Sequence, residues 1–123
     1  HDDEWTVIGA MGEKPQPYGT GGEIEMWKSR NEGCEWEKIS EVTQNSTFNH
    51  SYVRRSLGAR EPFVALWADG NPHRPSVSRL YFTDFTGSRI WRLPEKMTAE
   101  TEVVKPLEEN EPLGSCQLEK AHA

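Results

Sequence analysis

Polar and apolar residues alternate along several short stretches of this chain, and turn-forming residues separate the stretches. A period of two is typical of β-strands that bury one face and expose the other. No convincing helical pattern lies between the stretches. We therefore expect seven strands, at residues 4–8, 23–28, 35–41, 50–56, 63–69, 79–83 and 89–93.

The connections between these strands are rich in glycine, proline and asparagine. Residues 9–22 and 69–78 hold many of these turn formers, and both segments are predicted to be long surface loops. Short strands joined by such turns predict an all-β fold built from antiparallel sheets.

The most specific motif is the segment from Ser29 to Trp36, which fits the pattern S/T-x-D/N-x-G-x-x-W. Ser29 and Asn31 carry short side-chain oxygens that can accept hydrogen bonds from nearby backbone N–H groups. Gly33 can take a positive φ that strains other residues, and Trp36 is expected to cover the turn. Because strand-like alternation flanks the segment on both sides, the motif predicts a β-hairpin.

A weaker copy of this motif follows between the sixth and seventh predicted strands. Thr83, Gly87 and Ile90 match the serine, glycine and tryptophan of the first copy, whereas Phe85 replaces the asparagine. The spacing from Gly33 to Gly87 is close to the roughly 40 to 50 residues of one four-stranded propeller blade. The two copies therefore predict two repeats of one structural unit.

At these positions the chain resembles the Asp-box, or BNR, repeat proteins, in which such hairpins form the outer edge of β-propeller blades. The resemblance implies antiparallel four-stranded blades, about two of them, in an incomplete propeller fragment. Residues 1–48 are expected to form a first blade that lacks its innermost strand, and residues 49–96 a complete second blade. Residues 97–123 are predicted to be an irregular acidic segment. The remaining blades must come from the same or another chain, because two blades cannot close a ring.

The composition and the net charge limit which class of protein this chain belongs to and which partners it can bind. The chain has 123 residues with 34% hydrophobic and 28% charged residues, which suits a soluble globular unit, and no apolar run is long enough to cross a bilayer. A net charge of −6 makes nucleic acid and anionic membrane surfaces poor partners. The first residue, His1, is not methionine and no signal peptide follows, so we expect a fragment of a longer protein.

Two cysteines, Cys34 and Cys116, lack the spacing of a metal site and are expected to be unpaired thiols, with a single bridge as the alternative. No cofactor and no metal are expected. Asn45 and Asn49 each begin a short N-glycosylation pattern, which carries information only if the protein is secreted from a eukaryotic cell.

The candidate catalytic residues lie at the start of the fourth predicted strand. Strand periodicity places His50, Tyr52 and Arg54 on one face, and residues 9–22, 42–49 and 70–78 are expected to surround that end of the strand. In a propeller, inner strands of this kind line the central channel.

A longer resemblance, from about Gly21 to Met97, is to the BNR repeat-containing family that includes ulvan-lyase-like polysaccharide lyases. It is carried by blocks such as 49–55, 66–70 and 90–94. The resemblance implies a secreted or periplasmic protein that cleaves acidic, uronate-containing polysaccharides by β-elimination. It implies His50, Tyr52 and Arg54 as catalytic residues and Arg55, Trp67 and Asp69 as substrate-binding residues.

Structural roles compete with each of these assignments. A tyrosine or histidine on an inner strand is often a hydrogen-bonded structural group, Arg54 and Arg55 can pair with a carboxylate such as Asp69, and tryptophans in strands often pack between sheets. Two other functions stay open. One is a non-catalytic propeller subunit that binds carbohydrate or protein, and the other is a sialidase-like glycoside hydrolase, although no pair of acids stands at suitable positions.

Overall fold

The computed structural model describes residues 3–11 and 21–107, and within them every regular element is a β-strand. The all-β class is therefore confirmed, and each predicted strand has a counterpart whose ends differ by a few residues. The strands are β1 (Trp5–Met11), β2 (Glu23–Ser29), β3 (Glu37–Glu41), β4 (Asn49–Arg60), β5 (Phe63–Gly70), β6 (Leu80–Thr83) and β7 (Ile90–Arg92).

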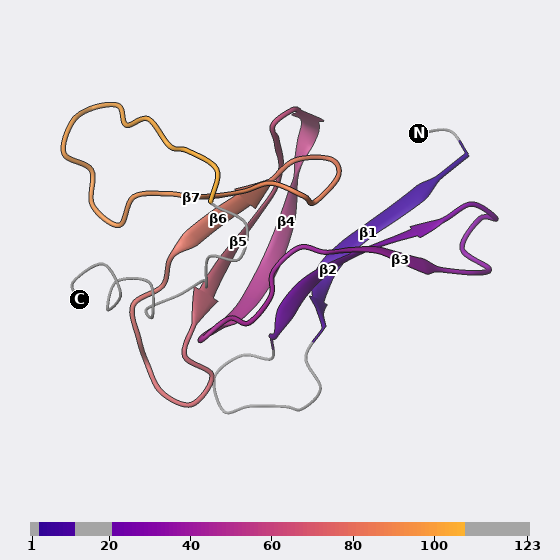
Figure 1. Cartoon of the computed structure of the whole chain (residues 1–123), viewed down its shortest axis with the longest axis horizontal. Helices are drawn as coiled ribbons and strands as arrows, with labels where there is room; N and C mark the ends of the chain where they lie inside the picture. Colours follow the sequence, from indigo (N-terminus) through magenta and orange to yellow (C-terminus); the bar gives the residue numbers. More distant parts are fainter. Residues whose placement is uncertain (1–2, 12–20, 108–123) are drawn as a thin grey trace.

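The strands form two antiparallel sheets, each in chain order (Figure 1). The first sheet has the order β1-β2-β3 and the second has the order β4-β5-β6-β7. Two reciprocal backbone hydrogen bonds between Gly22 and His50, at 3.1 and 2.9 Å, connect the start of β2 to the start of β4. The two sheets are thus joined at one end by main-chain contacts.

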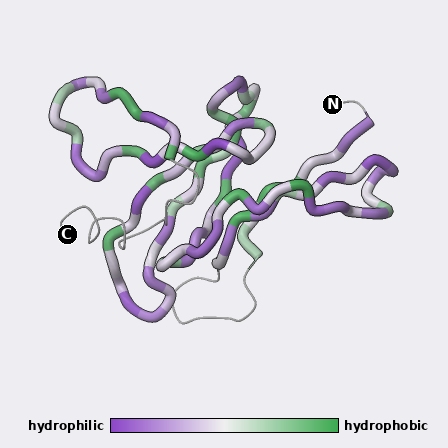
Figure 2. The backbone as a smooth tube through the Cα atoms, viewed as in Figure 1, coloured by the Kyte–Doolittle hydropathy of each residue, from purple (hydrophilic) through white to green (hydrophobic). Residues whose placement is uncertain are grey.

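The core lies between the two sheets and takes side chains from both. Ile24 and Met26 project from β2, Val42 follows β3, and Trp67 and Tyr81 come from β5 and β6. The alternate residues of β2 are less buried, as expected for a strand with one covered face. Figure 2 shows hydrophobic segments where the two sheets meet and a largely hydrophilic turn between β2 and β3.

The predicted hairpin between β2 and β3 is present, and its hydrogen bonds follow the motif. Ser29 Oγ accepts from the Gly33 N–H at 2.8 Å, and Asn31 Oδ1 accepts from the Glu35 N–H at 2.8 Å. Gly33 has a φ of 88°, and the Trp36 indole N–H donates to the Gly33 carbonyl at 3.0 Å. Side chains of the motif therefore satisfy the backbone of the turn.

The β6–β7 turn uses a different set of hydrogen bonds. Thr83 Oγ1 donates to the Arg89 carbonyl at 2.7 Å instead of accepting from the glycine N–H. Asp84 takes over the capping role, because its Oδ1 accepts from the Thr86 N–H at 3.2 Å. The glycine is the common feature, since Gly87 also has a positive φ, of 71°.

We expect Gly87→Ala to lower the free energy of unfolding by about 2 to 3 kcal/mol, because two costs add. Alanine is strained at positive φ, and its β-carbon would lie 2.9 Å from Cγ2 of Val42, the residue that follows β3. Gly58→Ala is the matched control, because Gly58 has a φ of 64° and nothing within 4 Å of an added β-carbon. Gly58→Ala should lower the free energy of unfolding by about 1 kcal/mol, as measured by urea denaturation. Equal losses in the two variants would show that the turn does not pack against the first sheet.

Residues 93–107 contain no strand, and they return along the outer edge of β7. Trp91 and Pro106 form an isolated bridge, and the Leu107 N–H donates to the Ile90 carbonyl at 2.7 Å. In the described ranges no helix is long and apolar enough to cross a membrane.

Candidate functional site

The connections 42–49 and 70–78 lie at the same end of the molecule, at the bottom of Figure 1. The third connection expected there, 9–22, falls largely outside the described residues. A groove with a volume of about 330 Å³ opens at this end. The strand ends and the loop after β5 line it, with Asn49, Ser51, Tyr52, Ala68, Asp69, Gly70, Asn71, Arg74, Pro75, Ser76 and Ser78.

Tyr52 and Arg74 are the two large exposed side chains of this groove. Tyr52 is 68% exposed, and Arg74 is exposed on the loop after β5. The loop is held by its own polar side chains, because Ser76 Oγ accepts from the Asn71 N–H and Asn71 Oδ1 accepts from the His73 N–H, both at 2.8 Å. A phenol and a guanidinium therefore border one polar hollow.

A bulge in β4 explains why Tyr52 is exposed while His50 is buried. The register between β4 and β5 shifts between Ser51 and Arg54, and Tyr52 has a φ of 60°. The extra residue reverses the alternation, so that His50 pairs with Asp69 whereas Arg54 pairs with Leu66 on the opposite face. The prediction that His50, Tyr52 and Arg54 share one face was therefore wrong, because an inserted residue resets the period of two.

His50 lies fully buried beneath the groove with both ring nitrogens engaged. Its Nδ1 accepts from the Trp67 indole N–H at 2.8 Å, which assigns the proton to Nε2 and lets it donate to Ser46 Oγ at 2.9 Å. Burial lowers the pKa of His50 from 6.5 to about 4, although the nearby Asp69 carboxylate opposes this shift. The imidazole is therefore neutral at pH 7 and fixed in one tautomer.

Asp69 and Trp67, which were expected to bind substrate, belong to the same buried network. Asp69 Oδ1 accepts from the Arg79 N–H, and Asp69 Oδ2 accepts from the Tyr81 hydroxyl, both at 2.8 Å. Burial raises the pKa of Tyr81, and the Asp69 carboxylate raises it further. The Trp67 ring stacks on the Tyr81 ring with a centroid distance of 5.9 Å. These side chains support the floor of the groove, and Asp69 also lines it.

Arg54 and Arg55 lie farther along β4, outside the groove. Both are exposed, and because Arg54 pairs with Leu66 and Arg55 with Ala65, they project from opposite faces of the sheet. Their predicted roles, like the catalytic role predicted for His50, stay predictions. The structure brings only Tyr52 among the predicted catalytic residues to the groove as an exposed side chain.

Arg74 is the charged groove residue that the sequence pattern did not indicate, and Asn71 and Ser78 were not indicated either. Its segment, 70–78, was expected at this end of the fold, so a basic residue within that loop was the available signal. No repeating pattern marks it, because loop residues do not follow strand periodicity.

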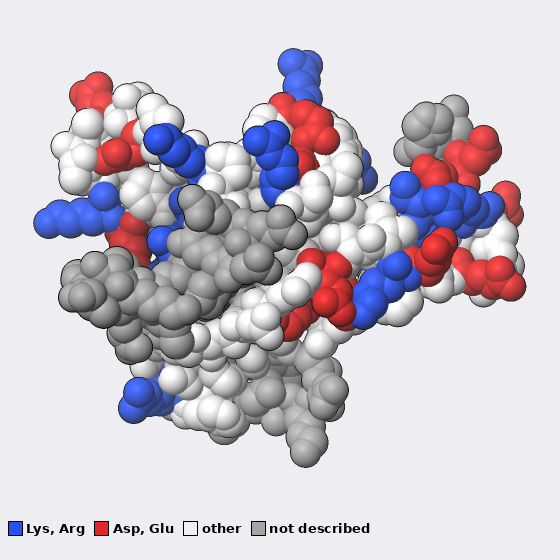
Figure 3. Space-filling view, in the orientation of Figure 1, with Lys and Arg blue, Asp and Glu red and all other residues white. Residues whose placement is uncertain are grey.

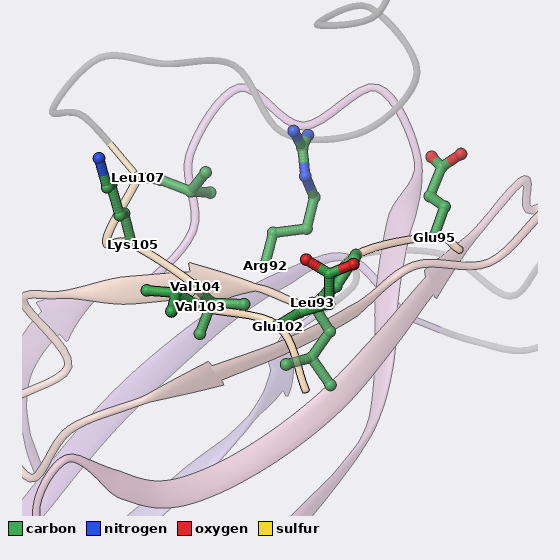
Figure 4. Close-up of a pocket in the computed structure, with 9 residues that line it drawn as sticks. Arg92, Leu93, Glu95, Glu102, Val103, Val104, Lys105 and Leu107 are labelled. Carbon is green, nitrogen blue, oxygen red and sulfur yellow. The ribbon is translucent and has the colours of Figure 1, made fainter. Parts of the chain in front are cut away.

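A second hollow, of about 440 Å³, lies between the end of β7 and residues 102–107 (Figure 4). Figure 4 shows Arg92 and Glu95 projecting to one side of the backbone and Leu93 to the other. Its charged residues balance, with Arg92 and Lys105 beside Glu95 and Glu102. None of the predicted site residues lines it.

Residues 3–11 and 21–107 contain no group of three or more histidine, cysteine or acidic side chains placed to hold a metal ion. Cys34 is an exposed free thiol in the β2–β3 turn, and Cys116 lies outside the described residues. Comparison with models of protein families, with curated proteins and with solved structures finds no match to this chain. The resemblance to Asp-box proteins therefore stands on the motif residues.

Proposed function

We propose that the chain forms two adjacent blades of a carbohydrate-active β-propeller, and that the groove beside Tyr52 and Arg74 binds an acidic glycan. The two consecutive antiparallel sheets, packed on a shared core, support the propeller arrangement. The hydrogen bonds of the Ser29 hairpin agree with the outer turn of an Asp-box blade.

The need for further blades is supported by apolar side chains that the two sheets leave exposed. Val7 and Met11 on β1 are 44% and 43% exposed, and Leu80 on β6 is 44% exposed. Isolated sheets with exposed apolar faces gain stability when another layer covers them. The remaining blades come from the same or another chain, and we assign the protein to secreted or periplasmic carbohydrate metabolism.

The observation that carries the binding proposal is the placement of Arg74 and Tyr52 on one polar hollow. A guanidinium forms paired, charge-assisted hydrogen bonds to a carboxylate, which is the group that distinguishes a uronate from a neutral sugar. Asn71 and Ser78 add polar groups suited to sugar hydroxyls. An acidic sugar of a polysaccharide matches this set in both charge and hydrogen-bonding capacity.

The activity proposed for the complete propeller is a polysaccharide lyase that uses Tyr52. The phenol, as its phenolate, takes the proton from the carbon next to the uronate carboxylate, and Arg74 stabilises the charge that develops on the carboxylate. The electron pair then forms a carbon–carbon double bond as the neighbouring glycosidic bond breaks. The leaving oxygen takes the proton back from Tyr52, so that protons and charge balance.

A binding function without catalysis is the second candidate, and the burial of His50 favours it. With the imidazole engaged by Trp67 and Ser46, Tyr52 is the exposed proton-transfer group among the described groove residues. A sialidase-like hydrolase has less support, because Asp69 is the single carboxylate among those lining residues and hydrolysis commonly needs two.

We expect Arg74→Ala to weaken binding of a uronate oligosaccharide by about ten-fold or more, because a charge-assisted pair is lost. Isothermal calorimetry measures the affinity. Arg60→Ala, at the far end of β4, is the control and should leave the affinity unchanged.

The lyase proposal further predicts absorbance from an unsaturated product. Tyr52→Phe should abolish this absorbance while binding is kept. Binding without product supports the non-catalytic candidate, and no difference between Arg74→Ala and Arg60→Ala contradicts the binding proposal.

A further inference from the structure

Two tryptophans lie close to Gly33 at the outer end of the first sheet. A β-carbon placed on Gly33 would lie 2.9 Å from Cζ3 of Trp5 and 3.8 Å from Cζ2 of Trp36. Both indoles therefore reach the glycine, because it has no side chain to keep them away. The residues Trp5, Gly33 and Trp36 are called the tryptophan pair site below.

The Trp36 ring of this site is anchored by a hydrogen bond, and both rings remain partly accessible. Trp5 is 50% exposed and Trp36 is 40% exposed, whereas Trp67 and Trp91 are buried in the second sheet. The Trp36 indole N–H is bound to the Gly33 carbonyl, and Trp5 begins β1 opposite Ser29. Aromatic faces that are held in place and left in solvent lose little conformational freedom when a ligand stacks on them.

Charged side chains surround the tryptophan pair site, and the basic ones are already paired. Glu4 contacts Lys28 and Arg30 at 3.3 and 3.0 Å, and Arg30 also contacts Glu37 at 3.2 Å. Two further acids, Glu32 and Glu35, are exposed on the turn. Figure 3 shows acidic and basic side chains side by side at this end of the molecule. Among the described residues, Lys28 and Arg30 both have acidic partners, and Glu32 and Glu35 add negative charge, so these surroundings disfavour an anion.

We propose that the tryptophan pair site binds a neutral pyranose sugar, which stacks its apolar C–H face on the indole rings. The exposed aromatic faces supply the apolar contact, and the rim of Glu and Arg side chains can exchange hydrogen bonds with ring hydroxyls. The acidic excess disfavours uronates, so this site differs in chemistry from the groove beside Arg74. A glycan that alternates neutral and acidic sugars presents both kinds of ligand to the one protein.

The test is a heteronuclear NMR titration of the five tryptophan indole N–H signals with methyl glycosides of galactose, glucose and xylose. We expect at least one of these neutral sugars to shift the Trp5 and Trp36 signals and to leave the Trp67 signal in place. Sodium glucuronate should shift neither. Trp5→Ala should weaken the binding followed at Trp36 by about five-fold.

Leu57→Ala is the control for the loss of exposed apolar surface, because Leu57 is fully exposed at the far end of β4. The Leu57→Ala protein should bind the sugar as tightly as the unchanged protein does. Trp36→Phe keeps an aromatic face without the hydrogen bond to Gly33 and should retain part of the binding. Absence of any shift at Trp5 and Trp36, or shifts that persist unchanged in Trp5→Ala, would overturn the proposal. Arg74→Ala should leave these shifts unchanged, so failure at the groove and failure here are separate results.

Discussion

Trp67→Ala should lower the free energy of unfolding by about 4 kcal/mol, the largest loss expected from one substitution in this chain. The Trp67 side chain is 1% exposed and lies in the core shared by the two sheets. Removal of the indole opens a cavity beside Tyr81. It also leaves His50 Nδ1 without its donor, and a buried group that loses its hydrogen bond lowers the free energy of unfolding further. Urea denaturation followed by circular dichroism measures the difference.

Two control variants separate burial from the hydrogen bond. Trp5→Ala removes the same type of side chain from a half-exposed position and should cost about 1 kcal/mol or less, apart from any effect on sugar binding. Trp67→Phe keeps most of the apolar volume but loses the indole N–H, so we expect about 2 kcal/mol. If Trp67→Ala lowered the free energy of unfolding no more than Trp5→Ala does, this would contradict a core shared by the two sheets.

Acidification should destabilise the protein through His50 by about 2 to 3 kcal/mol between pH 7 and pH 4.5. The folded pKa is about 4 and the unfolded value is 6.5, so the folded state favours the neutral ring. This contribution is complete above pH 6.5 and is lost as the pH falls toward 4, because the unfolded chain takes up the proton first. Tyr81 and Asp69 face the same ring, and the Asp69 carboxylate limits the size of the effect.

The comparison that isolates this effect uses His50→Gln and His73→Gln, with urea denaturation at both pH values. His50→Gln should be less stable than the unchanged protein at pH 7 but should lose about 2 to 3 kcal/mol less on acidification. His73 is exposed on the loop after β5, so His73→Gln should follow the unchanged protein at both pH values. Identical pH dependence in His50→Gln and the unchanged protein would contradict the buried neutral imidazole.

The strands were accessible to sequence reasoning because their burial follows the residue pattern. In β2, Ile24 and Met26 are buried while Glu23 and Glu25 are only partly covered, so a period of two is visible in the sequence. The hairpin after β2 was equally accessible, because each fixed position of its motif satisfies the backbone of the turn. Local chemistry was enough to predict both features.

The candidate site was less accessible, because a bulge and long-range pairing determine it. Tyr52 has a positive φ although it is neither glycine nor asparagine, so the residues around it do not predict the bulge. The bond from Trp67 to His50 joins residues on different strands, whereas strand periodicity together with the resemblance to propellers placed His50 at an open channel. Arg74 entered the groove from a loop, where position depends on the turn and not on periodicity.

Binding of an acidic glycan to the groove at the start of β4 can be tested by titration with a uronate oligosaccharide, with backbone amide shifts mapped by heteronuclear NMR. We expect the largest shifts at Ser51, Tyr52, Asn71 and Ser76, and we expect Arg74→Ala to reduce them greatly. Shifts confined to another surface, or a groove that stays unchanged at saturation of the ligand, would contradict binding in the groove.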